Sequence, residues 1–194
     1  MAADNFLWFP QAATGGLLKG KSTKPEGETS DKFFSGKKAL EVLSFSFGTS
    51  QAETSGSAST GAGVGKAKFD EFTIEKYVDL ASVPIYNACA AGEHFPSVQL
   101  AVRKAGGSPL LYLQYIFRMV FVTSIGWSGG GGEETPKETI KFKFGAMGIQ
   151  YIPQNPDGTQ RASDKMDAAW NVISNEPSLT VNGLPGPPSY EQAQ

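Results

Sequence analysis

The sequence predicts an all-β fold with one short α-helix. Glycine (23) and proline (12) are abundant among the 194 residues and aromatic side chains are plentiful, which favours strands joined by turns. The clearest strand runs from Leu111 to Trp127, where the side chains alternate with a period of two. Gln114 and Arg118 interrupt its apolar residues, so the run is too short and too polar for a membrane helix.

Short strands and long loops are expected in the first part of the chain. A first strand is predicted from Asp4 to Phe9, and residues 20–38 form a loop without periodicity. A low-complexity loop covers residues 52–65, and alternation resumes from Lys66 to Lys76, with Phe72 and Ile74 on its apolar face. Between the loops, the stretch Ala39–Gln51 predicts one strand. Its core face carries Leu43, Phe45 and Phe47, and its polar face carries Ser44 and Ser46.

The helix is expected near Val83–Ala91, with Ser82 as its N-cap and Gly92 as a left-handed stop. Strands follow at Val98–Arg103, in the long strand and at Thr139–Tyr151, with a turn at 105–109 and a glycine-rich hairpin loop at 128–136. Within Thr139–Tyr151 the apolar phase slips by one residue, which predicts a bulge between Gly145 and Gly148.

The chain is expected to form one domain over residues 1–173. A last strand ends near Trp170, and a turn at NPDGTQ precedes it. Residues 174–194 are rich in proline and glycine and have the composition of a disordered tail.

Composition excludes several classes of function. The formal net charge of -2 gives no electrostatic footprint for nucleic acid or for an anionic membrane. Cys89 is the single cysteine, so no disulfide can form within the chain. The N-terminus has neither a basic region nor a long apolar run, so we expect no signal peptide and folding in the cytoplasm.

No residue pattern predicts catalysis, a metal or a cofactor. His94 is the single histidine and has no cysteine or histidine cluster around it, so we interpret it as a turn residue after the helix. The run Gly129–Gly132 lacks the lysine of a phosphate-binding loop. Lys141 and Lys143 are expected on the solvent side of a strand. We therefore predict a protein that is not an enzyme.

Several motifs together resemble one known family. The segments ALEVLSFSFGTSQ, ACAAGEHF (Ala88–Phe95), RKAGG (Arg103–Gly107), the long strand with its glycine loop, and the following E-x-I-x-F-x-F strand have the order and spacing of the Hcp family, the tube proteins of type VI secretion systems. The resemblance covers roughly Ala39–Trp170. It departs from the family pattern near the N-terminus, where an insertion precedes GETSD (Gly27–Asp31) and phenylalanines replace a histidine.

The resemblance implies a β-barrel of two packed sheets with one flanking helix, tail-tube-like, that assembles into hexameric rings. The rings would stack into a tube inside a contractile sheath, and the tube would leave the cell with effectors and with the spike or tip proteins of the apparatus. A long, weakly charged strand needs a closed barrel or a partner, and identical copies in a ring would supply one. Candidate subunit-interface positions on the long strand are Tyr112, Gln114 and Arg118.

Other positions in that assembly are also candidates. Ser44 and Ser46 could face the lumen and contact effectors, although alternation leaves open the outer face of the barrel instead. Candidate ring-stacking residues in the two long loops are Gly56, Ser57, Gly61, Gly63, Lys24 and Glu28. Two alternatives stay open: a tail-tube protein of a phage or phage-like contractile injection particle, and a secreted hydrolase whose activity would depend on His94.

Overall fold

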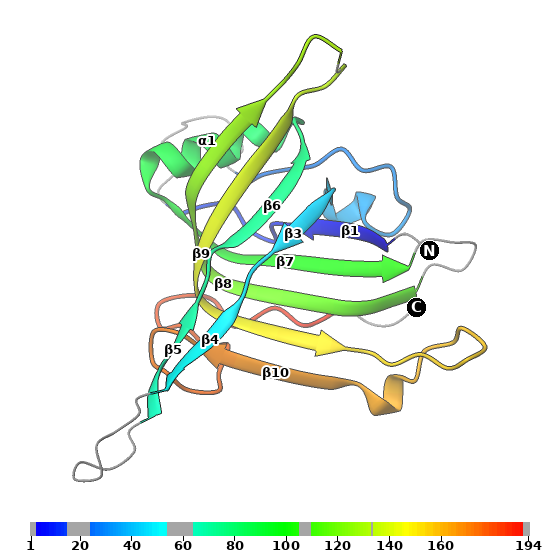
Figure 1. Cartoon of the computed structure of the whole chain (residues 1–194), viewed down its shortest axis with the longest axis vertical. Coiled ribbons are helices and arrows are strands. Elements are labelled where there is room, and N and C mark those ends of the chain that lie inside the picture. Colours follow the sequence, from blue (N-terminus) through cyan, green and yellow to red (C-terminus); the bar gives the residue numbers. More distant parts are fainter. Residues whose placement is uncertain (1–2, 15–23, 54–63, 105–109, 133, 192–194) are drawn as a thin grey trace.

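A computed structural model gives the structure of residues 3–14, 24–53, 64–104, 110–132 and 134–191. These residues are mostly β with one α-helix, as predicted (Figure 1). The strands are β1 (Ala3–Trp8), β2 (Leu40–Val42), β3 (Ser44–Ser46), β4 (Thr49–Glu53), β5 (Val64–Phe69), β6 (Phe72–Tyr77), β7 (His94–Lys104), β8 (Leu110–Ser128), β9 (Lys137–Tyr151) and β10 (Met166–Asn171). The helix α1 spans Ser82–Ala91, and two 3-10 turns lie at Ser35–Lys37 and Ala162–Asp164.

One sheet wraps almost completely around the core. Its strand order is β2-β1-β7-β8-β9-β6-β3, and β10 also pairs with β9. Closure comes from the consecutive strands β2 and β3, because β2 pairs with β1 and β3 pairs with β6 at the other end of the order. Leu43 lies where the chain changes partner and is 45% exposed, so the prediction of one continuous strand with Leu43 in the core is wrong.

A two-stranded arm projects from this wrap (Figure 1). It consists of β4 and β5, which continue β3 and β6 beyond a break where the N–H of Asp70 donates to the carbonyl of Gly48 at 2.9 Å. The predicted strand Lys66–Lys76 is therefore two strands. Phe72 and Ile74 are buried as predicted, and the tip of the arm lies outside the described residues.

A crease crosses β7, β8 and β9 and divides the wrap into two packed sheets. On each strand the core-facing alternation shifts by one residue at a line through Pro96, Met119 and Gly145; in β8, for example, Phe117 is followed in the core by Val120. Met119 has a φ of 51°, in the left-handed region that non-glycine residues rarely adopt. Because the strands shift together, their pairing keeps its register across the line.

The phase slip that the sequence shows in β9 is therefore real, but it is not a bulge against β8. The register shift between β8 and β9 lies instead between Val122 and Ser124. At Gly145, β9 exchanges its second partner, from β6 to β10. A Cβ on Gly145 would lie 2.6 Å from Cδ1 of Ile173, so a side chain there would have to displace the end of Ile173, where the chain folds back after β10.

The core between the two sheets is aromatic. The ring of Phe72 stacks on Phe117 at 4.4 Å and on Phe142 at 5.7 Å between centroids. Each fully buried phenylalanine contributes about 1.5–3 kcal/mol relative to an exposed one. Helix α1 covers one end of this core with Ile85 and Ala88 and ends at Gly92, whose φ of 67° confirms the predicted left-handed stop.

A buried ionic network fixes the start of α1. Lys76 is fully buried, and its Nζ lies 2.9 Å from Oε1 of Glu138 and 2.7 Å from Oδ1 of Asp79. The prediction that Ser82 caps the helix is wrong. Ser82 is the first residue of α1, and its hydroxyl donates to Glu138 at 2.8 Å. Trp127 Nε1 donates to the other oxygen of Glu138 at 3.0 Å, so every group of the network has a partner.

The C-terminal segment differs from the predicted disordered tail. After β10 the chain turns at Asn171–Glu176 and then runs without regular structure to Glu191, packed on the sheet face that points away from the core. Val181 is 5% exposed, and Glu191 pairs with Lys37 at 2.9 Å. The proline- and glycine-rich composition of this segment is therefore that of an irregular segment that becomes ordered by packing on the sheet.

No helix in the described part of the chain is long and apolar enough to cross a membrane.

Candidate functional site

One sheet presents a polar outer face, which we call the serine face: Ser44, Ser46, Thr73, Glu75 and Lys141. The backbone register sets these residues in rows, with Ser46 opposite Thr73 and Thr73 opposite Lys141. The hydroxyl of Ser44 donates to Oε2 of Glu75 at 3.4 Å. Ser44, Ser46 and Lys141 are exposed, while the intervening residues of the same strands fill the core.

The serine face offers hydroxyls and both signs of charge. Lys141 and Lys143 lie on its solvent side as predicted. Such a surface can donate and accept hydrogen bonds.

The open edges of the molecule lie elsewhere than the sequence suggested. β8 is a central strand, paired with β7 on one side and with β9 on the other. Of its predicted interface residues, Tyr112 is half-buried, and Gln114 and Arg118 are buried beneath the C-terminal segment of the same chain. Backbone closure within the subunit thus supplies the partner that this strand needed.

The arm and β10 carry unpaired edges. Within the described residues, β10 pairs with β9 alone, and β4 and β5 pair with each other alone. Met166, Asp167 and Ala168 of β10 are exposed. Sequence reasoning expected a last strand ending near Trp170 but did not identify it as an edge, because local alternation does not show which distant strand it pairs with.

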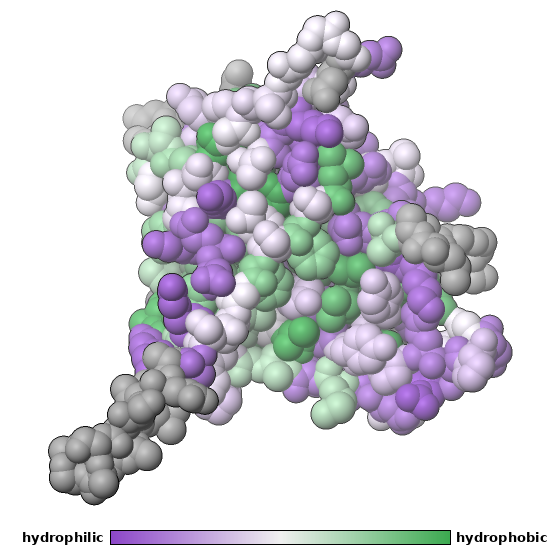
Figure 2. Space-filling model, in the orientation of Figure 1, coloured by the Kyte–Doolittle hydropathy of each residue, from purple (hydrophilic) through white to green (hydrophobic). Residues whose placement is uncertain are grey.

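An apolar cleft of about 430 Å³ separates the arm from β9 and β10. Figure 2 shows apolar surface between the base of the arm and β10. An apolar surface next to unpaired backbone groups is typical of an interface with another protein. Its lining is Thr49, Gln51, Ala67, Phe69, Met147, Ile149, Ala168, Ala169 and Trp170.

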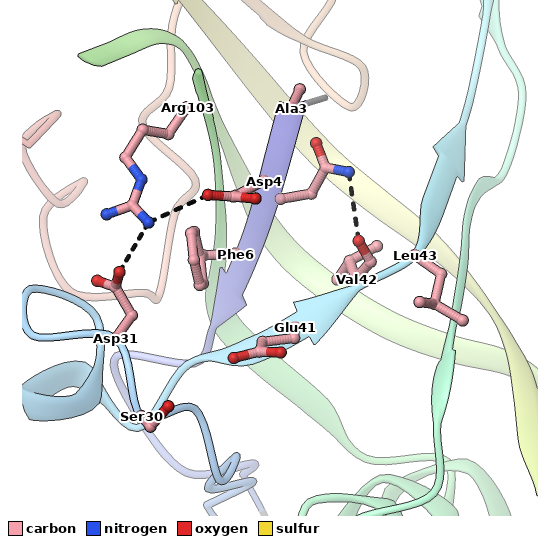
Figure 3. Close-up of a pocket in the computed structure, with 10 residues that line it drawn as sticks. Ala3, Asp4, Phe6, Ser30, Asp31, Glu41, Val42, Leu43 and Arg103 are labelled. Atoms are coloured by element: carbon pink, nitrogen blue, oxygen red, sulfur yellow. Dashed lines mark hydrogen bonds and ion pairs between the residues drawn. The ribbon is translucent and has the colours of Figure 1, made fainter. Parts of the chain in front are cut away.

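A second cleft, also about 430 Å³, surrounds Arg103 of the RKAGG motif (Figure 3). Its Nη2 lies 2.7 Å from Asp31 and 3.2 Å from Asp4, and the guanidinium stacks over Phe6 at 4.9 Å. Burial alone would raise the pKa of Asp31, but hydrogen bonds from Arg103 and from the backbone of Phe33 and Phe34 outweigh it and lower that pKa.

These carboxylates are committed to structural contacts. Asp31 and Asp4 neutralise Arg103, and Glu41 accepts a hydrogen bond from Thr29 at 2.7 Å. The ion pairs of Arg103 therefore connect the loop around Asp31 to β1 and β7. Its arrangement explains why the motif needs an arginine, which can pair with two carboxylates through one planar group.

The remaining candidate residues lie apart from one another. His94 is the first residue of β7, not a turn residue, and its Nδ1 lies 3.0 Å from the hydroxyl of Thr14. No cluster of His, Cys, Asp or Glu in the described ranges could hold a metal ion. Glu28 is exposed and Lys24 is partly buried in the loop before Asp31. Gly56, Ser57, Gly61 and Gly63 lie outside the described residues.

Comparisons with known proteins agree with one another. Residues 17–151 match the family described as type VI secretion system effector, Hcp. Protein hcp1 of Pseudomonas aeruginosa is 33% identical over 111 residues, which are 57% of this chain and 68% of that protein.

Solved structures give the same result. One described as a type six secretion system protein has a TM-score of 0.76 at 29% identity, covering 91% of this chain and 100% of the other. Hcp1 from Salmonella typhimurium has a TM-score of 0.67 at 27% identity, covering 92% and 100%.

Proposed function

This chain belongs to the Hcp family of type VI secretion proteins, and we propose that it is a structural subunit of the secretion tube. Six copies form a ring, and rings stack into a tube that sheath contraction propels. The tube assembles in the cytoplasm and is then secreted with effectors and the tip proteins of the apparatus. Its work is mechanical, with no bond made or broken.

The observation that carries this proposal is the pair of unpaired edges beside an apolar cleft. The arm and β10 differ from each other, so contact between the arm of one copy and β10 of the next is heterologous. Contacts of that kind generate a ring when the rotation between copies closes. Burial of the cleft would then contribute to stability at about 25 cal/mol for each Å² removed from water.

Imaging of purified protein tests ring formation directly. The variant Ala168→Glu places a charge on the exposed edge strand that lines the cleft, and we expect it to leave folded subunits that do not form six-fold rings. Ala90→Glu, at an exposed position of α1, is the matched control and should form rings. Six-fold rings in both variants would contradict the proposed interface.

Cargo contact is assigned to the serine face. Its small hydroxyls leave space in a lumen, so Ser46→Gln should reduce effector loading without loss of rings. Exposure and the polar rows around Ser46 support this assignment. Unchanged effector loading and effector stability in Ser46→Gln would exclude it.

Ring stacking is assigned to the two long loops. Deletion of residues 52–65 should reduce tube formation while rings survive, because it removes the outer part of the arm and keeps its base, Thr49–Gln51 of β4 and Lys66–Phe69 of β5. Tubes of normal length after the deletion would count against this role. We also retain residues 1–173 as the tube domain, with the remaining segment as an appendage.

A further inference from the structure

The C-terminal segment lies in a groove on the sheet face opposite the core. We call this surface the tail groove and define it by Gln99, Gln114, Arg118, Gly148 and Gln150. These residues come from β7, β8 and β9, beyond the crease, and the segment that crosses them spans 177–191. The charged and amide residues among them are at most 6% exposed, because the segment covers them.

The groove recognises main-chain atoms of the segment. Gln114 makes two hydrogen bonds to one residue: its Nε2 donates to the carbonyl of Glu191 at 3.0 Å, and its Oε1 accepts from the N–H of Glu191 at 2.8 Å. Gln99 Nε2 donates to the carbonyl of Ser189 at 3.5 Å, and Arg118 donates to the carbonyl of Pro185. An amide that pairs with both backbone groups of one residue reproduces the pairing of a β-strand.

Shape also fits the segment to the groove. Gly148 forms a depression, since a Cβ there would lie 2.9 Å from Cδ1 of Leu179 and would also collide with the hydroxyl of Tyr190. The sequence GLPGPPSY of residues 183–190 favours an extended polyproline conformation, which loses little entropy on binding. The site thus has the features of a built peptide-binding groove.

Two features of the contact favour release of the segment. It adds no strand to the sheet within the described residues, and Pro185, Gly186 and Pro187 are exposed. The floor beneath it is rich in amides and carries Arg118, groups that water can hydrate when the segment departs. Release therefore uncovers a polar surface together with a few apolar contacts.

We propose that the tail groove is a peptide-binding site that exchanges the C-terminal segment of its own chain for that of a second copy. Exchange of identical elements keeps every contact and so has little energetic cost. Copies held close together in a ring or tube raise the effective concentration of the segment to about the millimolar range. Each exchanged segment would link two subunits without any new interface.

The ion pair of Lys37 with Glu191 provides a readout in the unmodified chain. The two groups lie 2.9 Å apart, so a carbodiimide can join them directly as an amide. Chains labelled with ¹⁵N are mixed with unlabelled chains as dissociated subunits, concentrated, cross-linked and analysed by peptide mass spectrometry. We expect the Lys37–Glu191 product first within one isotope and then between isotopes, rising toward about half of all pairs for random exchange between identical copies.

Matched glycine variants confirm that the product reports the groove. Gly148→Val fills the depression and should abolish the product, whereas Gly126→Val, on β8 with open space beside it, should retain it. Tyr190→Ser weakens the segment without altering the barrel, and it should lower the yield if Gly148→Val does not fold. Circular dichroism reports folding in each case.

Three results would overturn the proposal: no Lys37–Glu191 product in the wild-type chain, a product that stays within one isotope however long the chains are mixed, or the same yield in Gly148→Val as in Gly126→Val. Ring imaging of the same samples is read separately. Loss of exchange with rings intact therefore rejects this inference and leaves the tube function standing.

Discussion

Two buried cations in this molecule differ in how completely they are paired with other groups. Lys76, beneath helix α1, contacts two carboxylates within 2.9 Å and donates to the carbonyl of Tyr77. Arg118, beneath the C-terminal segment, is 1% exposed, and in the described part of the chain its single hydrogen-bond partner is the carbonyl of Pro185. Its Nε has no partner there, and burial lowers the pKa of Arg118.

The difference shows which of the two buried sites is costly to open. A buried charge with complete partners is costly to break, because each removed group leaves another charge unpaired. A buried charge with one carbonyl partner gains little from its burial and is better solvated when the cover leaves. The start of helix α1 is therefore costly to expose to water, whereas the tail groove can be exposed at a smaller cost.

The largest effect is expected at the start of helix α1. Lys76→Met leaves Glu138 and Asp79 without their cation in a buried site, which should lower the free energy of unfolding by about 3–5 kcal/mol. Urea denaturation of the purified chain measures this loss. The double variant Lys76→Met/Glu138→Leu removes the two fully buried charges, leaves Asp79 at the partly exposed side of the site, and should recover much of the loss. A loss below about 1 kcal/mol in the single variant would show that the network does not fix the helix end.

Local patterns predicted much of the barrel. Alternation identified Phe72 and Ile74 as residues of an apolar face, and both are fully buried. It could not predict that the segment around Leu43 changes partners, since pairing between distant strands decides that point. The crease was visible only in β9, because the strand predicted at Val98–Arg103 began beyond it and β8 carries apolar side chains on both faces.

An intermediate effect is expected where the segment fills the depression. Gly148→Val forces the segment off the sheet, and overpacking of this kind costs about 1–3 kcal/mol. Urea denaturation measures the cost, and limited proteolysis should show faster cleavage after Asn171. Gly126→Val should remain within about 0.5 kcal/mol of the wild type, as surface changes usually do. Equal effects of the two valines would mean that the segment does not occupy the groove.

A still smaller effect is expected for the cation beneath the C-terminal segment. Arg118→Met removes a buried charge that lacks a carboxylate, and the freed carbonyl of Pro185 lies at an exposed residue that water reaches. The free energy of unfolding should therefore change by less than about 1 kcal/mol, because replacing an unpaired buried ion by an apolar group is often neutral. A loss as large as that of Lys76→Met would remove the contrast between the two sites.

The candidate site was harder to predict than the barrel. Ser44 and Ser46 were found because one-sided alternation marks a solvent-facing side. The tail groove was missed for a physical reason: Gln99 and Gln114 recognise backbone atoms, which leave no sequence pattern, and a proline-rich segment reads as disordered when its binding surface is unknown. Residue composition therefore describes the segment alone, and the groove decides its structure.

The smallest effect is a shift in titration that reports the same contact. Burial in the groove, with a further contribution from Asp167, raises the pKa of Tyr190 to about 12. Since the pKa of a free tyrosine is about 10, the neutral phenol favours docking. That contribution is complete below pH 10 and is lost as the pH rises toward 12.

The absorbance of tyrosinate at alkaline pH, taken as the difference between the wild type and Tyr190→Phe, should follow this late titration. The same difference measured in a Gly148→Val background should return to the ordinary range, whereas a Gly126→Val background should keep the late titration, because only the former variant expels the ring from the groove. An ordinary Tyr190 titration in the wild-type chain would mean that water already surrounds the phenol and that the segment is not docked.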